Sequence, residues 1–265
     1  MVNFRNRIAW VTGASSGIGK EIALALAREQ AHLILSAKNP EELEVVASEC
    51  RKYTPFCHEV PFDLSDPEEV ERIAKSVVNT YGHIFLLINN GGISQRSLAV
   101  ETPVEIDRKI MEVDYFSHVI ITKTVIPGMI EAGVGYIAAT SSISGKFGFM
   151  YRSAYAAAKH AIQGFFETLR VELKPHNISV TIAYPGRIRT NISLHALDKE
   201  GNEYGKMDPG QSNGLAPQKC AKRYIRAVKR RKPEILIGKS ELLMVHIKRL
   251  LPSLFYKMVS RVNPV

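Results

Sequence analysis

The sequence predicts an α/β fold: one domain over residues 1–265, built as a doubly wound parallel sheet of about seven strands with helices on both faces. Three observations carry this prediction. Short apolar runs alternate with helix-like segments along the chain. A glycine-rich turn joins the first apolar run to the first helix. Polar residues also recur where successive strands end, the edge at which such sheets bind ligands.

The amino end has the order strand, glycine-rich turn, helix. Residues 8–11 are an apolar run, residues 12–19 contain three glycines, and apolar positions at helical spacing follow over 20–30. Glycines let the backbone approach a pyrophosphate, which rests at the helix N-terminus. The spacing is Gly-x-x-x-Gly-x-Gly, and an ordinary glycine-rich loop is the alternative. Nucleotide contacts are expected from Gly13, Ser15, Ser16, Gly17, Ile18 and Gly19.

The later elements continue the alternation. Asp66 and Pro67, followed by two glutamates, are typical of a helix start, and Gly82 of a helix end. Pro127 is expected to kink or divide a long helical stretch. The further strands are expected over 32–37, 56–62, 84–89, 136–141, 179–184 and 234–238, and the further helices over 40–53, 65–81, 103–132 and 152–173.

One group of residues predicts proton transfer. Tyr155 and Lys159 are four apart on a helix and therefore share one face, and Ser142 lies thirteen residues before the tyrosine. An ammonium beside a phenol favours the phenolate, and a serine hydroxyl can hold the same carbonyl or alcohol oxygen. A packing tyrosine and a solvated lysine are the alternative interpretation.

Together these residues resemble the short-chain dehydrogenase/reductase family over nearly the whole chain. Residues 12–19 are similar to its cofactor turn, and 89–92 to its Asn-Asn-Ala-Gly strand end, with Gly91 in place of the usual Ala. Residues 87–98 are similar to the dehydrogenase/reductase member 7 subgroup, itself similar to microsomal hydroxysteroid and retinoid reductases. The resemblance implies a Rossmann-type fold, Ser142, Tyr155 and Lys159 as catalytic residues, and cofactor contacts from Asp63, Leu64, Asn90, Gly91, Tyr155, Lys159, Pro185, Gly186, Ile188 and Thr190.

The end of the second strand bears on the cofactor. NAD enzymes usually place an acid there for the ribose 2′-hydroxyl, but residues 35–39 contain no acid and one cation, Lys38. Because Lys38 can meet a 2′-phosphate as a point charge, NADP(H) is expected in preference to NAD(H). A surface lysine at a strand end is the alternative.

Asp114 departs from the family pattern. The family has an asparagine there, which holds a water that links the lysine to solvent. An ionised Asp accepts but does not donate hydrogen bonds, and it would pair with Lys159 and weaken its effect on Tyr155. We therefore keep two functional hypotheses: an oxidoreductase that moves hydride between nicotinamide and the alcohol or carbonyl of a lipophilic substrate, such as a steroid or retinoid, and a nucleotide-binding scaffold with little turnover.

Two segments lie outside the alternation. Residues 187–215 hold four glycines and little periodicity, which predicts a substrate lid with short helical pieces, or else a tolerated insertion. Residues 240–265 mix apolar and basic side chains, which suits a helix at an anionic membrane surface. Packing on the domain or on a second subunit is the alternative, and a homodimer is expected.

The distribution of charge and the cysteines exclude some functional classes and indicate a cellular location. Residues 219–265 carry 13 of the basic residues against two acids, while the rest of the chain holds 22 basic and 24 acidic residues. A basic tail beside a near-neutral fold argues against a nucleic-acid groove. Cys50, Cys57 and Cys220 have no metal spacing and indicate a reducing compartment. With no signal peptide or membrane span, the expected location is intracellular, peripheral on the endoplasmic reticulum membrane.

Overall fold

The computed structural model describes residues 2–259. It contains a seven-stranded sheet in the order β3-β2-β1-β4-β5-β6-β7, and every pair of neighbours is parallel. The order reverses between β1 and β4, where open α/β sheets bind their ligands. The strands are β1 (Ile8–Thr12), β2 (His32–Ser36), β3 (Cys57–Glu59), β4 (Leu86–Asn89), β5 (Gly135–Thr140), β6 (Ile178–Pro185) and β7 (Glu234–Ile237).

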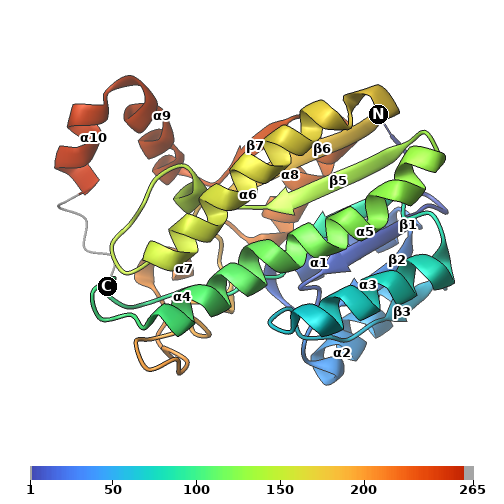
Figure 1. Cartoon of the computed structure of the whole chain (residues 1–265), viewed down its shortest axis with the longest axis horizontal. Coiled ribbons are helices and arrows are strands. Elements are labelled where there is room, and N and C mark those ends of the chain that lie inside the picture. Colours follow the sequence, from blue (N-terminus) through green and yellow to red (C-terminus); the bar gives the residue numbers. More distant parts are fainter. Residues whose placement is uncertain (1, 260–265) are drawn as a thin grey trace.

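Helices cover both faces of the sheet (Figure 1), so the predicted fold class is confirmed. One apolar core gathers residues of α1, α2 and α8, and the other gathers residues of α3, α5 and α6. The α-helices are α1 (Gly17–Arg28), α2 (Pro40–Arg51), α3 (Pro67–Tyr81), α4 (Val104–Met111), α5 (Ser117–Glu131), α6 (Ser153–Glu172), α7 (Pro209–Ser212), α8 (Pro217–Lys229), α9 (Leu243–Leu250) and α10 (Pro252–Val259).

The predicted start of α3 is confirmed in its bonding. Asp66 is the N-cap, and its carboxylate accepts hydrogen bonds from Glu68 N at 3.1 Å and Glu69 N at 3.0 Å. Pro67 occupies the first turn, where its missing N–H costs nothing, and Gly82 follows the last turn at φ +69°. Local sequence chemistry thus defines both ends of this helix.

Three predictions about elements need correction. The third strand is only three residues long, Cys57–Glu59, although Val60 N and Phe62 N still donate to Leu35 O at 2.8 Å and Ala37 O at 3.1 Å. Pro127 does not divide the helix, because α5 runs through it, and the expected kink there stays a prediction. The hydrogen bonding changes at a π turn, Glu112–Phe116, between α4 and α5. Helix α8 was not predicted, although its buried residues recur at helical spacing.

The C-terminal helices α9 and α10 stand apart from the sheet at the upper left of Figure 1. Their inner side packs on the loop that follows β5: Phe255 is 2% exposed, and its ring centroid lies 5.1 Å from that of Phe147. Residues 260–265 of the predicted tail segment lie outside the described residues. Within residues 2–259, no helix is both long and apolar enough to cross a membrane.

Candidate active site

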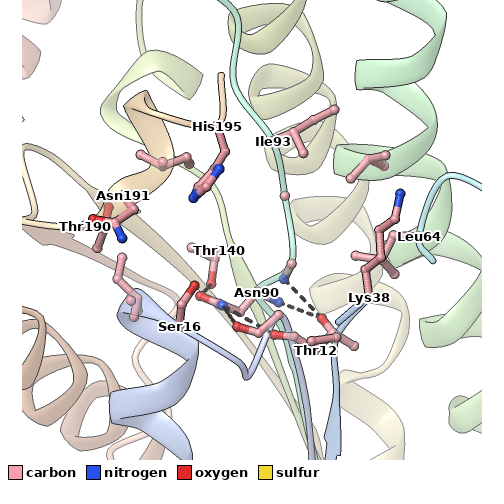
Figure 2. A pocket seen from close by; sticks show the side chains of 18 of the residues that line it. Thr12, Ser16, Lys38, Leu64, Asn90, Ile93, Thr140, Thr190, Asn191 and His195 are labelled. Carbon is pink, nitrogen blue, oxygen red and sulfur yellow. Dashed lines mark hydrogen bonds between the residues drawn. The ribbon is translucent and has the colours of Figure 1, made fainter. Parts of the chain in front are cut away.

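A cavity of about 550 Å³ lies at the carboxyl ends of the strands. It is lined by residues at the ends of β1, β2, β4, β5 and β6 and by the segment 187–215 (Figure 2). Of the predicted site residues, the cavity brings together Gly13, Ser15, Ser16, Gly17, Ile18, Lys38, Asp63, Leu64, Asn90, Gly91, Ser142, Tyr155, Lys159, Pro185, Gly186, Ile188 and Thr190. Two predicted residues, Gly19 and Asp114, do not line it.

Backbone geometry explains the glycines of the first turn. Gly13 and Gly17 have φ of +62° and +54°, a region that side chains disfavour. Gly19 has another role: a Cβ there would overlap the carbonyl oxygen of Gly13. Gly19 therefore allows α1 to pack closely against the turn, and its role as a cofactor contact stays a prediction. Ser16 is the N-cap of α1 and makes no side-chain capping bond. Gly17 and Ile18 of the first turn line the cavity, and their N–H groups therefore receive no acceptor from the Ser16 side chain.

Hydrogen bonds tie three strand ends together below the cavity (Figure 2). The Thr12 hydroxyl accepts from Asn90 N at 3.0 Å and from Gly91 N at 3.2 Å. The Asn90 amide donates to the carbonyls of Thr12 and Gly13, each at 3.3 Å, and its oxygen accepts from the Thr140 hydroxyl at 3.2 Å. The Asn90 side chain therefore links β1, β4 and β5. Thr140 had no part in the sequence-based site, and Thr12 entered it only as the first residue of the turn 12–19.

The substitution of Ala by Gly at position 91 has a local reason. A Cβ on Gly91 would overlap the Cδ1 methyl of Leu64, which also lines the cavity. Gly91 also approaches the first turn closely, because a Cβ on Gly13 would lie 2.6 Å from Gly91 Cα. The Gly91–Leu64 contact thus replaces the methyl group that the family usually supplies.

Lys38 lies just after the end of β2, and Asp63 lies beyond β3. They form an ion pair with 2.8 Å between Lys38 Nζ and Asp63 Oδ2. Partial burial disfavours the Asp63 carboxylate, but the hydrogen bonds from Lys38 and Ser65 outweigh it and lower its pKa. The Lys38 side chain is 77% exposed, so this pair is screened by water and can reorganise around a ligand.

Ser142, Tyr155 and Lys159 all border the cavity. Ser142 follows β5, is 8% exposed, and accepts a hydrogen bond from Ser144 N at 3.1 Å. Tyr155 lies in the first turn of α6, and the Lys159 ammonium lies 5.6 Å from the centroid of its ring. Close packing positions α6 here: the Ser141 hydroxyl donates to Lys159 O at 2.8 Å, and the missing Cβ of Gly145 makes room for the same carbonyl.

Lys159 is nearly enclosed and has two fixed partners. It donates to Thr140 O at 3.3 Å and pairs with Asp114 Oδ2 at 3.1 Å. Asp114 is fully buried in the π turn, and its other oxygen accepts from Ile93 N at 2.7 Å. Complete burial raises the pKa of Asp114, while the Lys159 ammonium and the Ile93 N–H act in the opposite direction. The expected Asp114–Lys159 pair is present, but Asp114 lies behind the cavity wall and not in it.

His118, in the first turn of α5, was missed. Its Nε2 lies 2.8 Å from Gly91 O, and the side chain is completely buried. Burial lowers its pKa to about 3, and the nearby Lys159 ammonium contributes to this shift. A neutral imidazole that donates from Nε2 therefore supports the strand end carrying Asn90 and Gly91. Its position four residues after Asp114 was the available signal.

The segment 187–215 forms one wall of the cavity, with short helical pieces at Asn191–Ser193 and at α7. Figure 2 shows His195 and Asn191 on the side opposite Lys38 and Leu64. His195 pairs with Glu203 at 2.9 Å. Sequence reasoning identified the segment but not its individual lining residues, which are Asn191, Ile192, His195, Leu197, Gly201, Glu203 and Gln211.

Comparisons with known proteins agree with this geometry. A family profile described as short chain dehydrogenase matches residues 7–201. The chain is 40% identical over 257 residues to dehydrogenase/reductase SDR family member 7B of Xenopus laevis, covering 94% of this chain and 80% of that protein. The Bos taurus protein of the same name is 39% identical over 265 residues, covering 97% and 81%.

A solved structure supports the same conclusion. The short-chain dehydrogenase from Streptomyces avermitilis superposes with a TM-score of 0.80 at 27% identity, covering 96% of this chain and 98% of that chain. The family resemblance inferred from the sequence is thereby confirmed, including the likeness to the member 7 subgroup. This chain belongs to the short-chain dehydrogenase/reductase family of NAD(P)-dependent oxidoreductases.

Proposed function

We propose that the protein is an NADP(H)-dependent oxidoreductase that acts on a secondary alcohol or carbonyl group of a lipophilic substrate. One observation carries this proposal: Ser142, Tyr155 and Lys159 border the same cavity as the glycine-rich turn. Gly17 and Ile18 of the first turn of α1 line this cavity, and the Ser16 side chain does not cap their N–H groups. Such a helix N-terminus suits a pyrophosphate.

The residues divide the chemistry as follows. The nicotinamide cofactor supplies or accepts the hydride when bound. Tyr155 gives its proton to the carbonyl oxygen in reduction and takes it back in oxidation, and Ser142 donates a hydrogen bond to the same oxygen. Lys159 favours the phenolate and would bind the ribose hydroxyls. Thr190 would hold the carboxamide, and its hydroxyl already accepts from Gln211 Nε2 at 3.1 Å.

Lys38 supports NADP(H) over NAD(H). The end of β2 contains no carboxylate that would bind a ribose 2′-hydroxyl, and Lys38 lies at the cavity with a largely exposed ammonium. A 2′-phosphate would compete with Asp63 for it. We expect NADPH to bind more tightly than NADH and Lys38→Asp to reverse that order by repulsion. Tighter binding of NADH by the unmodified protein would contradict the assignment.

Apolar side chains support a lipophilic substrate. Ile93, Val113, Ile192 and Leu197 line the cavity together with the catalytic residues. The test is NADPH oxidation over a panel of steroid, retinoid and quinone carbonyls. Turnover of at least one carbonyl class, lost in Tyr155→Phe, is the expected result.

A scaffold with little turnover is the second candidate, and the buried Asp114–Lys159 pair is the observation that favours it. An ammonium neutralised at 3.1 Å by a carboxylate has less effect on a neighbouring phenol. Tight NADPH binding with no turnover of any carbonyl in the panel would support this candidate against the first.

The exposed side of the C-terminal segment supports a peripheral location on an anionic membrane. Arg249 and Lys257 accompany the exposed apolar residues, whereas Lys248 is half-buried and donates to Lys146 O at 2.7 Å. No acid occurs between residues 242 and 259. Each cation near an anionic bilayer contributes about 1 kcal/mol. The exposed apolar residues are Leu243, Leu250, Leu251, Leu254, Tyr256 and Met258.

Flotation with phosphatidylserine-containing vesicles tests the membrane proposal. The full chain should float with them, less so in high salt, and the triple serine variant of Leu250, Leu251 and Leu254 should not. Val171→Ser is the matched control, because Val171 is 73% exposed on α6, away from the segment. If no protein floats and the triple variant instead dissociates a dimer in light scattering, the face is the interface of the expected homodimer.

A further inference from the structure

Four consecutive polar residues, 94–97, are buried behind the cavity wall. Each is at most 8% exposed, and their side chains do not line the cavity. Buried polar side chains cost free energy unless they are hydrogen-bonded, so their partners indicate their role. Besides neighbours such as Thr102, these partners belong to two segments far away in the sequence, namely the start of α6 and the lid, residues 187–215.

Gln95 caps the helix that carries Tyr155. Its Oε1 accepts a hydrogen bond from Ala154 N at 2.9 Å, directly before the tyrosine. Its Nε2 donates to the hydroxyls of Thr102 at 2.9 Å and Ser153 at 3.2 Å. The Gln95 side chain is completely buried, and both ends of its amide are used. It therefore fixes the first turn of α6 relative to the end of β4.

The next residue attaches the lid. The Arg96 N–H donates to Leu197 O at 2.7 Å, and Leu197 N donates to Ser94 O at 2.8 Å. These two bonds form a short parallel bridge between the segment after β4 and the lid. The backbone that places Gln95 against α6 thus also carries the lid.

One carboxylate of the lid contacts both the segment after β4 and the start of α6. Asp208 of the lid accepts from Arg152 Nη2 at 2.8 Å, and Arg96 Nη2 lies 3.5 Å from the same oxygen. Arg152 is the N-cap of α6, three residues before Tyr155. The side chains of Arg96, Asp208 and Arg152 are only 5%, 12% and 14% exposed. One lid carboxylate therefore joins the segment after β4 to the start of the catalytic helix.

The charges make this cluster sensitive to loss of Asp208. Burial lowers the pKa of Arg96 to about 10, and the positive charge of Arg152 adds to that effect, yet the Arg96 guanidinium stays charged at neutral pH. Asp208 is the acid that both contact, and removing its charge would leave two buried cations in close proximity. Breaking a buried ion pair in this way is strongly unfavourable.

We propose that Gln95, Arg96 and Asp208 are positioning residues that fasten the lid to the first turn of α6, so that the lid is closed when Tyr155 is in place. The consequence for turnover rests on the proposed function, whereas the physical coupling does not. A substrate or cofactor that passes the lid would have to loosen a cluster that also holds the start of the catalytic helix.

Hydrogen exchange on the protein without ligand tests the coupling. Asp208→Asn keeps the acceptor for Gly210 N but loses the charge. Amides 154–156 of α6 and 196–205 of the lid should both exchange about tenfold faster or more, which corresponds to about 1.4 kcal/mol. Asp198→Asn is the matched control, because Asp198 lies in the same lid and, within residues 2–259, its carboxylate accepts hydrogen bonds from the lid backbone amides of Glu200 and Asn202. Faster exchange confined to the lid in Asp208→Asn would overturn the proposal.

Kinetics provide a readout that general destabilisation would not produce. NADPH release should become faster and KM for the carbonyl should rise in Asp208→Asn, with partial recovery in Asp208→Glu. If NADPH release and KM are unchanged in a variant whose lid and α6 amides exchange faster, the cluster does not control closure of the lid. That result would contradict its positioning role. Failure of every carbonyl to react, with the exchange coupling intact, would instead refute the proposed function alone.

Discussion

At the scale of single residues, the main departure from the family is the carboxylate of Asp114. The family resemblance implies an amide there, and the structure places the carboxylate 3.1 Å from Lys159 in a fully buried position. The Asp114 carboxylate therefore offsets part of the positive charge of the Lys159 ammonium, which would otherwise act on the Tyr155 phenol. The Ile93 N–H bond to Asp114 would survive replacement by Asn, because the amide oxygen remains an acceptor.

Asp114→Asn should preserve the fold and raise activity at low pH. Removing the carboxylate charge leaves the Lys159 ammonium without its counter-charge, so that ammonium stabilises negative charge developing on the Tyr155 oxygen more strongly. We expect the acid side of the pH profile for alcohol oxidation to move to lower pH. Steady-state rates from pH 5 to 9 measure this. An identical profile in both proteins would mean that Asp114 does not influence the proton transfer.

His118 should make the protein acid-sensitive. Its pKa is lowered to about 3 in the folded state, so the unfolded chain binds a proton that the folded chain refuses as the pH falls below about 6.5. Stability is therefore lost with falling pH between these values, by up to about 1.4 kcal/mol per pH unit. His118→Gln, which keeps a donor for Gly91 O, should flatten this decline in urea titrations at pH 7, 6 and 5. Parallel curves for the two proteins would refute the assignment.

At the scale of elements, the site depends on an irregularity and on helix ends. The π turn Glu112–Phe116 presents Asp114 to Lys159, and π turns within helices often occur at functional sites. Helix periodicity predicted a helix here but not the π turn. A single extra residue in one turn leaves the pattern of apolar residues nearly unchanged. The N-terminus of α6 is likewise held by Gln95, a contact that no local pattern indicates.

The N-cap of α3 provides a test at this scale. Asp66→Ala removes an acceptor for Glu68 N and Glu69 N, and should lower the free energy of unfolding by about 1 kcal/mol without affecting NADPH binding. Chemical denaturation measures the loss. Asp66→Ser, which retains a capping oxygen, should recover most of it, and equal stability of all three proteins would show that the cap contributes nothing.

At the scale of the whole molecule, the sequence predicted what depends on local pattern. The sheet and the cavity residues at the strand ends follow from apolar runs and glycines, because parallel strands end at one edge. The pairs Lys38–Asp63 and Arg96–Asp208 join segments that only the folded chain brings together, so no spacing indicates them. Helix α8 has buried residues at helical spacing, a local signal for a helix, but its many basic residues resemble those of the basic tail that follows it.

The proposed function depends on Tyr155 as the residue that transfers the proton in an NADP(H)-dependent reaction. Tyr155→Phe removes only the phenolic oxygen, and the ring can keep its packing in the first turn of α6. The decisive measurement is the turnover of NADPH with a reactive carbonyl, compared with NADPH affinity in the same two proteins. We expect turnover to fall by about 10²–10⁴-fold while NADPH affinity changes little. Similar turnover in both proteins, or loss of NADPH binding that alone explains lower turnover, would contradict it.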